Sequence, residues 1–148
     1  MFDEARLIAT LSAAFPRFAG GLGIGDDAAI VAAEGNLVAT TDLLLEDVDF
    51  TAGTEIEHVV AKSLAANFSD VAAMGASPFA FLLTLGLNER ALGQFERLVS
   101  ALASRCRPLA VDLIGGDLSA AEKFLVSITA FGRFAEGARP LLRSAAQP

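Results

Sequence analysis

The apolar residues of this chain come in runs of strand length, and this limits what it can fold into more than any other feature. The most apolar run covers residues 79–87, far short of the roughly 20 residues that a membrane-spanning helix needs. The longest stretch without charge, residues 71–88, is broken by Gly75 and Pro78. Although 53% of the residues are hydrophobic, we expect no membrane segment. We attribute the excess to surface buried in an oligomer interface or against a further domain.

Alternating helical and extended patterns predict a mixed α/β or α+β fold. Asp3 and helical spacing predict a helix over residues 3–15, which Pro16 ends. Thr54 and Glu57 form a capping-box pattern that predicts a helix running to about residue 74. Asn88 predicts the start of another helix, which continues to about residue 105. Strands are predicted over residues 28–32, 37–45, 79–87, 109–114 and 124–134, and residues 135–148 are turn-rich and predict a linker.

One strand and several absences narrow the function. Residues 37–45 are apolar on both faces, which predicts a strand in the interior of the sheet. The net charge of −7 argues against nucleic acid as a partner. The single cysteine, Cys106, cannot form an internal disulfide, which fits a reducing, cytoplasmic compartment. The single histidine, His58, leaves no material for a His-rich zinc site. We expect both residues to be structural.

Phosphate-binding loops of the common kinds are missing from the sequence. No stretch matches the P-loop pattern G-x-x-x-x-G-K-[ST]. Residues 21–25 read G-L-G-I-G, but they follow a helix, whereas the dinucleotide fingerprint needs a preceding strand. Any phosphate site must therefore be built in another way.

Dispersed aspartates are the remaining candidates for chemistry. Asp27 follows a glycine loop, Asp42 lies in an apolar strand, and Asp117 follows two glycines at the expected C-terminal end of a strand. Helical geometry places Asp70 on the packed side of its helix, one turn after Asn67. A buried carboxylate needs a partner or a metal, and magnesium prefers carboxylate and phosphate oxygens. The pattern thus indicates a magnesium–phosphate site.

Each aspartate taken alone also fits a structural interpretation. A single aspartate after a strand is usually a turn or cap residue. Asp26 and Asp27 fit a solvated turn, and Asp70 fits a local cap after Ser69. Lys62 fits a surface lysine better than a phosphate ligand. From composition and spacing alone, these alternatives stay open.

The wording around the acids resembles a known family. Four strings occur in order: G-I-G-D-D-A-A at residues 23–29, T-T-D at 40–42, N-F-S-D-V-A-A-M-G-A-S-P at 67–78, and G-G-D at 115–117. Together they resemble the N-terminal domain of thiamine-monophosphate kinase, within the superfamily typified by aminoimidazole ribonucleotide synthetase. The resemblance covers about residues 3–148, and the string at 67–78 is its most specific part.

The resemblance implies an α/β (α+β) fold with a mixed sheet flanked by helices, which pairs with a second copy to form a dimeric barrel. It implies an ATP- and magnesium-binding domain over residues 1–138. Residues 139–148 would begin a linker to a C-terminal domain that this chain lacks. We therefore expect a cytoplasmic homodimer whose partners are ATP and a small phosphorylated acceptor, with neither nucleic acid nor membrane among them.

The resemblance also implies a chemistry: a phosphotransferase that uses ATP and Mg²⁺ to convert thiamine monophosphate to thiamine diphosphate. Such a transfer needs positioning and charge neutralisation more than a covalent nucleophile. The residues it assigns to the metal ions are Asp27, Asp42, Asp70, Asp117, Thr40 and Thr41, and those it assigns to ATP are Gly116, Asp117 and Arg143.

Residues 46–50 depart from the family pattern. They read E-D-V-D-F where the family usually has E-G-x-H-F, so Asp49 takes the position of the substrate-associated histidine and Asp47 that of a glycine. An aspartate cannot donate a hydrogen bond to a phosphate as histidine can. Three alternatives therefore remain: a sibling synthetase or dehydratase that uses ATP on another small molecule, a non-catalytic nucleotide- or metal-binding module, and an acidic dimerisation domain without a ligand.

Overall fold

A computed structural model describes residues 2–16, 18–32, 35–142 and 144 of the chain. The helices are α1 (Glu4–Ala14), α2 (Ile56–Ala73), α3 (Glu89–Gly93), α4 (Phe95–Cys106) and the 3₁₀ turn η1 (Arg107–Leu109). The strands are β1 (Gly21–Leu22), β2 (Ile30–Val31), β3 (Leu37–Leu45), β4 (Ser77–Leu87), β5 (Asp112–Ala120) and β6 (Leu125–Arg133).

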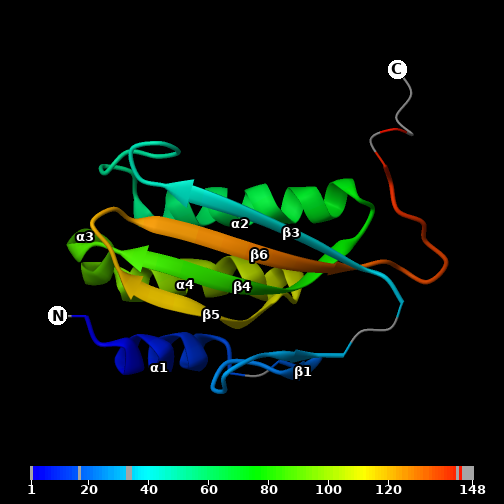
Figure 1. Ribbon diagram of the computed structural model, residues 1–148, viewed down its shortest axis with the longest axis horizontal. Coiled ribbons are helices and arrows are strands. Elements are labelled where there is room, and N and C mark those ends of the chain that lie inside the picture. Colours follow the sequence, from blue (N-terminus) through cyan, green and yellow to red (C-terminus); the bar gives the residue numbers. More distant parts are fainter. Residues whose placement is uncertain (1, 17, 33–34, 143, 145–148) are drawn as a thin grey trace.

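Four long strands form one mixed sheet in the order β3-β6-β4-β5 (Figure 1). β6 is antiparallel to both β3 and β4, whereas β4 and β5 are parallel. α2 and α4 lie behind this sheet, while α1 and the small β1-β2 ribbon lie beside its β5 edge (Figure 1). The predicted mixed sheet flanked by helices is confirmed.

The core fills the space between the sheet and α2 and α4. Side chains that point toward these helices, such as Phe81, Leu85 and Ile128, are fully buried. The apolar stripe predicted for α2 is confirmed, because Ile56 and Val71 are fully buried as well. The opposite face of the sheet carries no helix of this kind, and we call it the open face. No helix in the described part of the chain is both long enough and apolar enough to cross a bilayer.

Helix boundaries show what local sequence determines. The Asp3 side chain accepts a hydrogen bond from the Arg6 N–H, so its predicted capping role is confirmed. Asn88 likewise caps α3 through Ala91. The helix predicted over 89–105 is interrupted, because α3 ends at Gly93 and α4 begins at Phe95.

The capping box at Thr54 is wrong. Glu55 takes the N-cap position of α2 without a side-chain hydrogen bond. The Thr54 hydroxyl instead accepts from the Thr51 N–H, and Glu57 pairs with Arg97. The preceding turn thus engages the Thr54 side chain, and a long-range partner, Arg97, engages Glu57.

Three strand predictions also need correction. β3 has the predicted bounds but lies at the sheet edge, not in its interior, and Leu43 is 51% exposed. The strand predicted over 28–32 shortens to Ile30–Val31. β5 does not end before Gly115 but continues to Ala120, so Asp117 lies within the strand. Apolar content and glycines alone therefore did not determine strand order or strand ends.

Candidate functional site

An open cavity of about 930 Å³ lies on the open face of the sheet. Such a volume is in the range of small-molecule and cofactor sites. Its floor is made by β4, β5 and β6, and its walls come from α1 and the loop between β1 and β2. Its polar lining includes Asp26, Asp27, Thr84, Gly115, Gly116, Asp117 and Thr129.

The strand register brings the polar floor of this cavity together. Thr84 on β4 lies opposite Asp117 on β5, and on its other side opposite Ser127 on β6. Alternate residues of a strand share a face, so Thr129 joins them on the open face. Its hydroxyl donates to the Thr41 hydroxyl on β3 at 3.1 Å. Thr41 therefore lies next to the cavity floor without lining it.

Asp27 reaches the cavity from the loop between β1 and β2. The Asp26 carboxylate accepts a hydrogen bond from the Asp27 N–H at 2.9 Å, which shapes the turn. Gly25 beside it has a φ of +125°, a conformation that side chains rarely adopt. Asp27 and Asp117 are both exposed and line the same cavity. The structure thus brings together two of the four predicted aspartates.

Gly116 has a structural reason to be glycine. Its φ is +150°, and a Cβ built there would lie 1.8 Å from the Leu83 carbonyl oxygen of β4. The missing side chain lets β5 run against β4 and places Asp117 over the floor.

A second group of predicted residues lies on the helix-covered face. Thr40 and Asp42 alternate with Thr41 along β3, so they point toward α2. The Thr40 hydroxyl donates to Asp70 Oδ2 at 3.1 Å, and the Asp42 N–H donates to Asn67 Oδ1 at 3.0 Å. Asn67 is fully buried and donates in turn to the Ser63 carbonyl. These bonds tie α2 to β3.

The sheet therefore separates the predicted magnesium ligands into two groups. Asp27, Asp117 and Thr41 belong to the open face, whereas Thr40, Asp42 and Asp70 belong to the α2 side. Within the ranges the structure describes, no three or more acidic, histidine or cysteine side chains are close enough to hold an ion together. The expected burial of Asp70 is also wrong. Asp70 is exposed, whereas Asn67, Phe68 and Val71 of the same turn pack toward the core.

The four aspartates share one electrostatic property. Among the described residues, none of the ion pairs involves Asp27, Asp42, Asp70 or Asp117. Their negative charges are thus not compensated by lysine or arginine in that part of the chain. Carboxylates in this condition can accept a cation, and magnesium is commonly held by one or two carboxylates together with phosphate oxygens.

Asp49 does not extend its carboxylate toward solvent. Its Oδ2 accepts the Leu45 N–H at 2.9 Å, and its carbonyl accepts from the Lys62 ammonium. Asp47, at the position of the family glycine, has a φ of +69°. Glycine adopts such a backbone readily and aspartate at some cost. The backbone of this turn therefore keeps a shape suited to glycine.

The remaining candidates are Arg143, His58 and Cys106. Arg143 lies outside the described residues. His58 is exposed on α2. Burial, with the nearby Asp112 carboxylate, raises the pKa of the Cys106 thiol to about 12. A buried thiol with such a pKa is unreactive at neutral pH, which agrees with the structural role expected for it.

Sequence reasoning missed Thr84 and Thr129. Neither belongs to a motif, yet both line the cavity. A signal was present, because they are polar residues in otherwise apolar strands and each is flanked by buried neighbours. Period-two alternation could have assigned both to one face.

A known protein family matches the part of the chain that contains the site residues from Asp27 to Thr129. Residues 25–134 match the family described as AIR synthase related protein, N-terminal domain. This segment contains α2 and the whole four-stranded sheet. The chain belongs to this family.

The curated relatives that match this chain include thiamine-monophosphate kinases from several organisms. The chain is 36% identical over 129 residues to thiamine-monophosphate kinase of Mycobacterium tuberculosis, covering 85% of this chain and 38% of the relative. It resembles the structure of thiamine-monophosphate kinase from Stenotrophomonas maltophilia at 33% identity and a TM-score of 0.77, covering 93% of this chain and 44% of that one. A structure of AaThiL complexed with AMPPCP and TMP is similar at 34% identity and a TM-score of 0.61, covering 70% and 35%. The chain spans about two fifths of the length of the curated relatives it matches.

Proposed function

We propose that this chain is the nucleotide- and magnesium-binding part of a thiamine-monophosphate kinase. The observation that carries the proposal is the convergence of Asp27 and Asp117 on one cavity over a floor of threonine hydroxyls. The names of the relatives support the activity, and the AMPPCP and TMP bound to AaThiL support the two ligands. The reaction moves the γ-phosphoryl of ATP onto a phosphate oxygen of thiamine monophosphate, giving thiamine diphosphate and ADP.

The residues present fit magnesium as a partner of bound phosphates. Asp27 and Asp117 offer hard carboxylate oxygens at the cavity, where phosphate oxygens would complete the set. Thr40, Asp42 and Asp70 offer a second set of oxygens on the α2 side. Thr41 lies next to Thr129 of the cavity floor. Bound magnesium neutralises the charge that develops on the transferred phosphoryl group.

The chain's own groups would orient the nucleotide. We assign Gly116 and Asp117 to the ATP side of the cavity, and Arg143 to an ATP phosphate. Thr84 and Thr129 supply hydroxyl donors on the floor. Because no covalent intermediate is needed, holding donor and acceptor in line is the main task of these residues.

We further propose that the sheet pairs with that of a second copy at its exposed β3 edge to form a dimeric barrel. β3 is an edge strand, and its Leu37 and Leu43 are exposed. Exposed edges of this kind favour pairing with another chain. Pairing would cover part of the apolar excess seen in the sequence. The proposal includes action in the cytoplasm, which the absence of a possible internal disulfide supports. Sedimentation tests the pairing, and a clean monomer at micromolar concentration contradicts it.

One observation favours a second candidate. Asp49 stands where the family histidine is expected, and its carboxylate is occupied by a backbone N–H. A sibling enzyme that uses ATP on another small molecule would keep the cavity and change the acceptor. Nucleotide binding with no response to thiamine monophosphate would favour this candidate.

Calorimetric titration with AMPPCP, with and without Mg²⁺, tests the proposed function. We expect binding that strengthens with magnesium, and we expect Asp117→Asn to lose at least about tenfold of that gain, since a tenfold change is about 1.4 kcal/mol of binding. Asp112→Asn is the matched control, because Asp112 lies on the same strand and outside the cavity lining. Binding that ignores magnesium in the unsubstituted chain overturns the metal assignment.

A further inference from the structure

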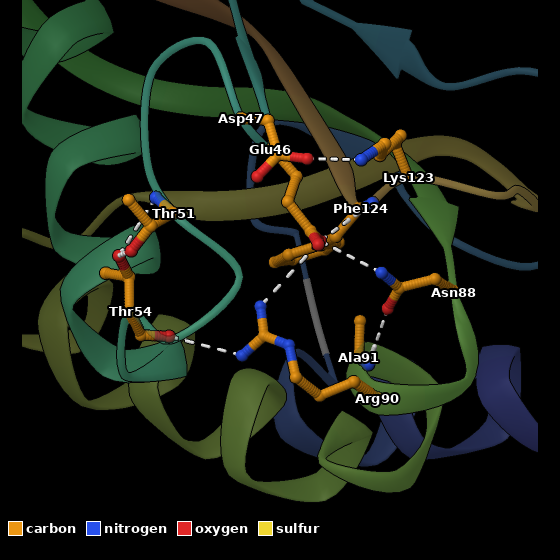
Figure 2. Close-up of polar contacts among 9 residues, drawn as sticks. All are labelled: Glu46, Asp47, Thr51, Thr54, Asn88, Arg90, Ala91, Lys123 and Phe124. Carbon is orange, nitrogen blue, oxygen red and sulfur yellow. Dashed lines mark hydrogen bonds and ion pairs between the residues drawn. The ribbon is translucent and has the colours of Figure 1, made fainter.

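A buried carboxylate, that of Glu46, lies at the C-terminal end of β3 (Figure 2). The Glu46 side chain is 7% exposed. Its Oε2 accepts the Asn88 amide at 2.9 Å and the Phe124 N–H at 3.2 Å. The Arg90 guanidinium lies 3.8 Å from the same oxygen. One carboxylate thus joins β3, β6 and α3 where these elements meet.

Arg90 extends this contact along the chain. Its Nη1 donates to the Thr54 carbonyl at 3.2 Å, while its Nη2 faces Glu46 (Figure 2). A single side chain thereby contacts both ends of residues 46–54, which we call the acceptor segment. Nε and Nη2 are buried without hydrogen-bond partners among the described residues. The Glu46 charge is therefore the group that compensates the guanidinium at this end.

Bonds within the acceptor segment keep its shape. The Asp47 N–H donates to the Phe50 carbonyl at 2.7 Å, and the Asp49 N–H donates to the Leu45 carbonyl at 2.9 Å. The Asp47 carboxylate pairs with Lys123 at the start of β6 (Figure 2). Phe50 packs edge-on against Phe124, with ring centroids 5.7 Å apart. The turn is closed internally, and the contacts of Glu46 and Arg90 fix its two ends to the body, in addition to the contacts that Lys123, Phe124 and Lys62 make with its middle.

Position 49 makes this placement functionally relevant. In the family pattern it carries the substrate-associated histidine, and here its backbone carbonyl is held by Lys62. The neighbouring Val48 is 75% exposed at the tip of the turn. A displacement of the acceptor segment would move position 49 relative to the Lys62 ammonium, because Lys62 belongs to α2 and not to the turn.

We propose that Glu46, Asn88 and Arg90 are positioning residues that hold the acceptor segment for the phosphorylated acceptor. They act through the segment and do not touch the nucleotide cavity. The proposal rests on the proposed function, and the acceptor role of position 49 is what the family resemblance implies. We call these three residues the clamp. The proposal predicts that substitutions in the clamp weaken binding of the acceptor and leave binding of the nucleotide unchanged.

The test uses the full chain, unsubstituted and with Glu46→Gln or Arg90→Lys. Glu46→Gln removes the buried charge and keeps the side-chain shape. Arg90→Lys keeps the positive charge but loses the planar fork that spans Glu46 and Thr54. Arg97→Ala is the matched control, because Arg97 also connects α4 to the start of α2, through Glu55 and Glu57, outside the clamp.

Two readouts separate positioning from a general structural role. Amide hydrogen exchange is expected to quicken at least about tenfold over residues 46–54 in both clamp variants and to stay within about twofold in α2 and β4. The Kd for thiamine monophosphate, measured with Mg²⁺ and AMPPCP present, is expected to rise at least about tenfold, while the Kd for AMPPCP stays within about twofold. Arg97→Ala should change neither.

The outcomes are distinct. Unchanged exchange in residues 46–54 overturns the clamp. Faster exchange with an unchanged Kd for thiamine monophosphate overturns the positioning role. If the unsubstituted chain binds AMPPCP with Mg²⁺ but not thiamine monophosphate, the acceptor assignment fails, and the positioning role fails with it. If it binds neither ligand, the proposed function itself fails.

Discussion

Two groups of carboxylates in this molecule have opposite surroundings. Asp27 and Asp117 are exposed at the open cavity and have no ion-pair partner among the described residues. Glu46 is buried and surrounded by an amide, a backbone N–H and a guanidinium. A carboxylate whose acceptor sites are filled contributes to structure, whereas one without a partner can receive a cation. The charge and the functional group are the same in both groups, so the surroundings decide the role.

The largest expected effect is on the buried group. Glu46→Ala would leave the Asn88 amide, the Phe124 N–H and the Arg90 guanidinium without their acceptor. Breaking one side of a buried pair typically costs about 3–5 kcal/mol. We expect a loss of this size in the free energy of unfolding, measured by urea denaturation. Glu46→Gln keeps one acceptor oxygen and should lose less. A loss for Glu46→Ala below about 1 kcal/mol would show that the carboxylate is not a structural centre.

The sequence predicted more of the fold than of its arrangement. The bounds of β3, the caps at Asp3 and Asn88 and the apolar stripe of α2 all follow from local patterns, and they are confirmed. The edge position of β3 could not be read, because an apolar strand looks alike at an edge or in the interior. Thr54 does not cap α2, because its hydroxyl accepts a hydrogen bond from the Thr51 N–H and Glu55 takes the N-cap position. This outcome depends on how the preceding turn folds.

The candidate site was predicted in the same uneven way. Motifs identified Asp27 and Asp117, and the folded chain brings both to one cavity. Helical geometry placed Asp70 on the packed side of its helix, and Thr40 of β3 does reach it there, but the burial of Asp70 was overstated. That Thr40 and Thr41 face opposite sides follows from period two. Which side holds the cavity depends on where α1 and the glycine loop fold, and no local pattern specifies that.

The second effect concerns the exposed carboxylates. Here we expect a change in ligand binding and little change in the stability of the fold. Asp27→Asn is expected to leave the unfolding free energy of the ligand-free chain within about 0.5 kcal/mol, as for most exposed positions. Ligand that binds only the folded state adds about 2.7 kcal/mol at about 100 times its Kd. We expect the unsubstituted chain with Mg²⁺ and AMPPCP to gain this amount and Asp27→Asn to lose most of it. Thermal unfolding with and without ligand measures both quantities, and an equal gain in the two chains contradicts the proposed role of Asp27.

The third effect tests whether the α2 side joins the same site. Asp70→Ala removes the acceptor of the Thr40 hydroxyl, and a bond of this kind contributes about 0.5–1.5 kcal/mol. Asp70→Asn keeps an acceptor oxygen and should cost less. Because Asp70 lies across the sheet from the cavity, we expect a smaller loss of magnesium-dependent AMPPCP affinity than for Asp27→Asn. Ser69→Ala is the neighbouring control, since its hydroxyl bonds only to the Ala66 carbonyl. A loss equal to that of Asp27→Asn would mean that both faces hold one metal cluster.

The smallest effect belongs to an exposed ion pair, which gives the comparison its baseline. The pKa of Glu57 is lowered from its ordinary value of 4.5. The largest cause is a hydrogen bond from the backbone of Glu57 to its own carboxylate, and the next is the hydrogen bond from the Arg97 guanidinium. Because the folded-state pKa is below the unfolded one, this stabilisation is present above about pH 4.5 and is lost as the pH falls through the lower folded value. Arg97→Ala should therefore move acid unfolding to a slightly higher pH and change little at pH 7, where surface pairs contribute weakly. Circular dichroism during acid titration measures the midpoint. A destabilisation at pH 7 comparable to that of Glu46→Ala would show that exposure does not separate the two kinds of carboxylate partner.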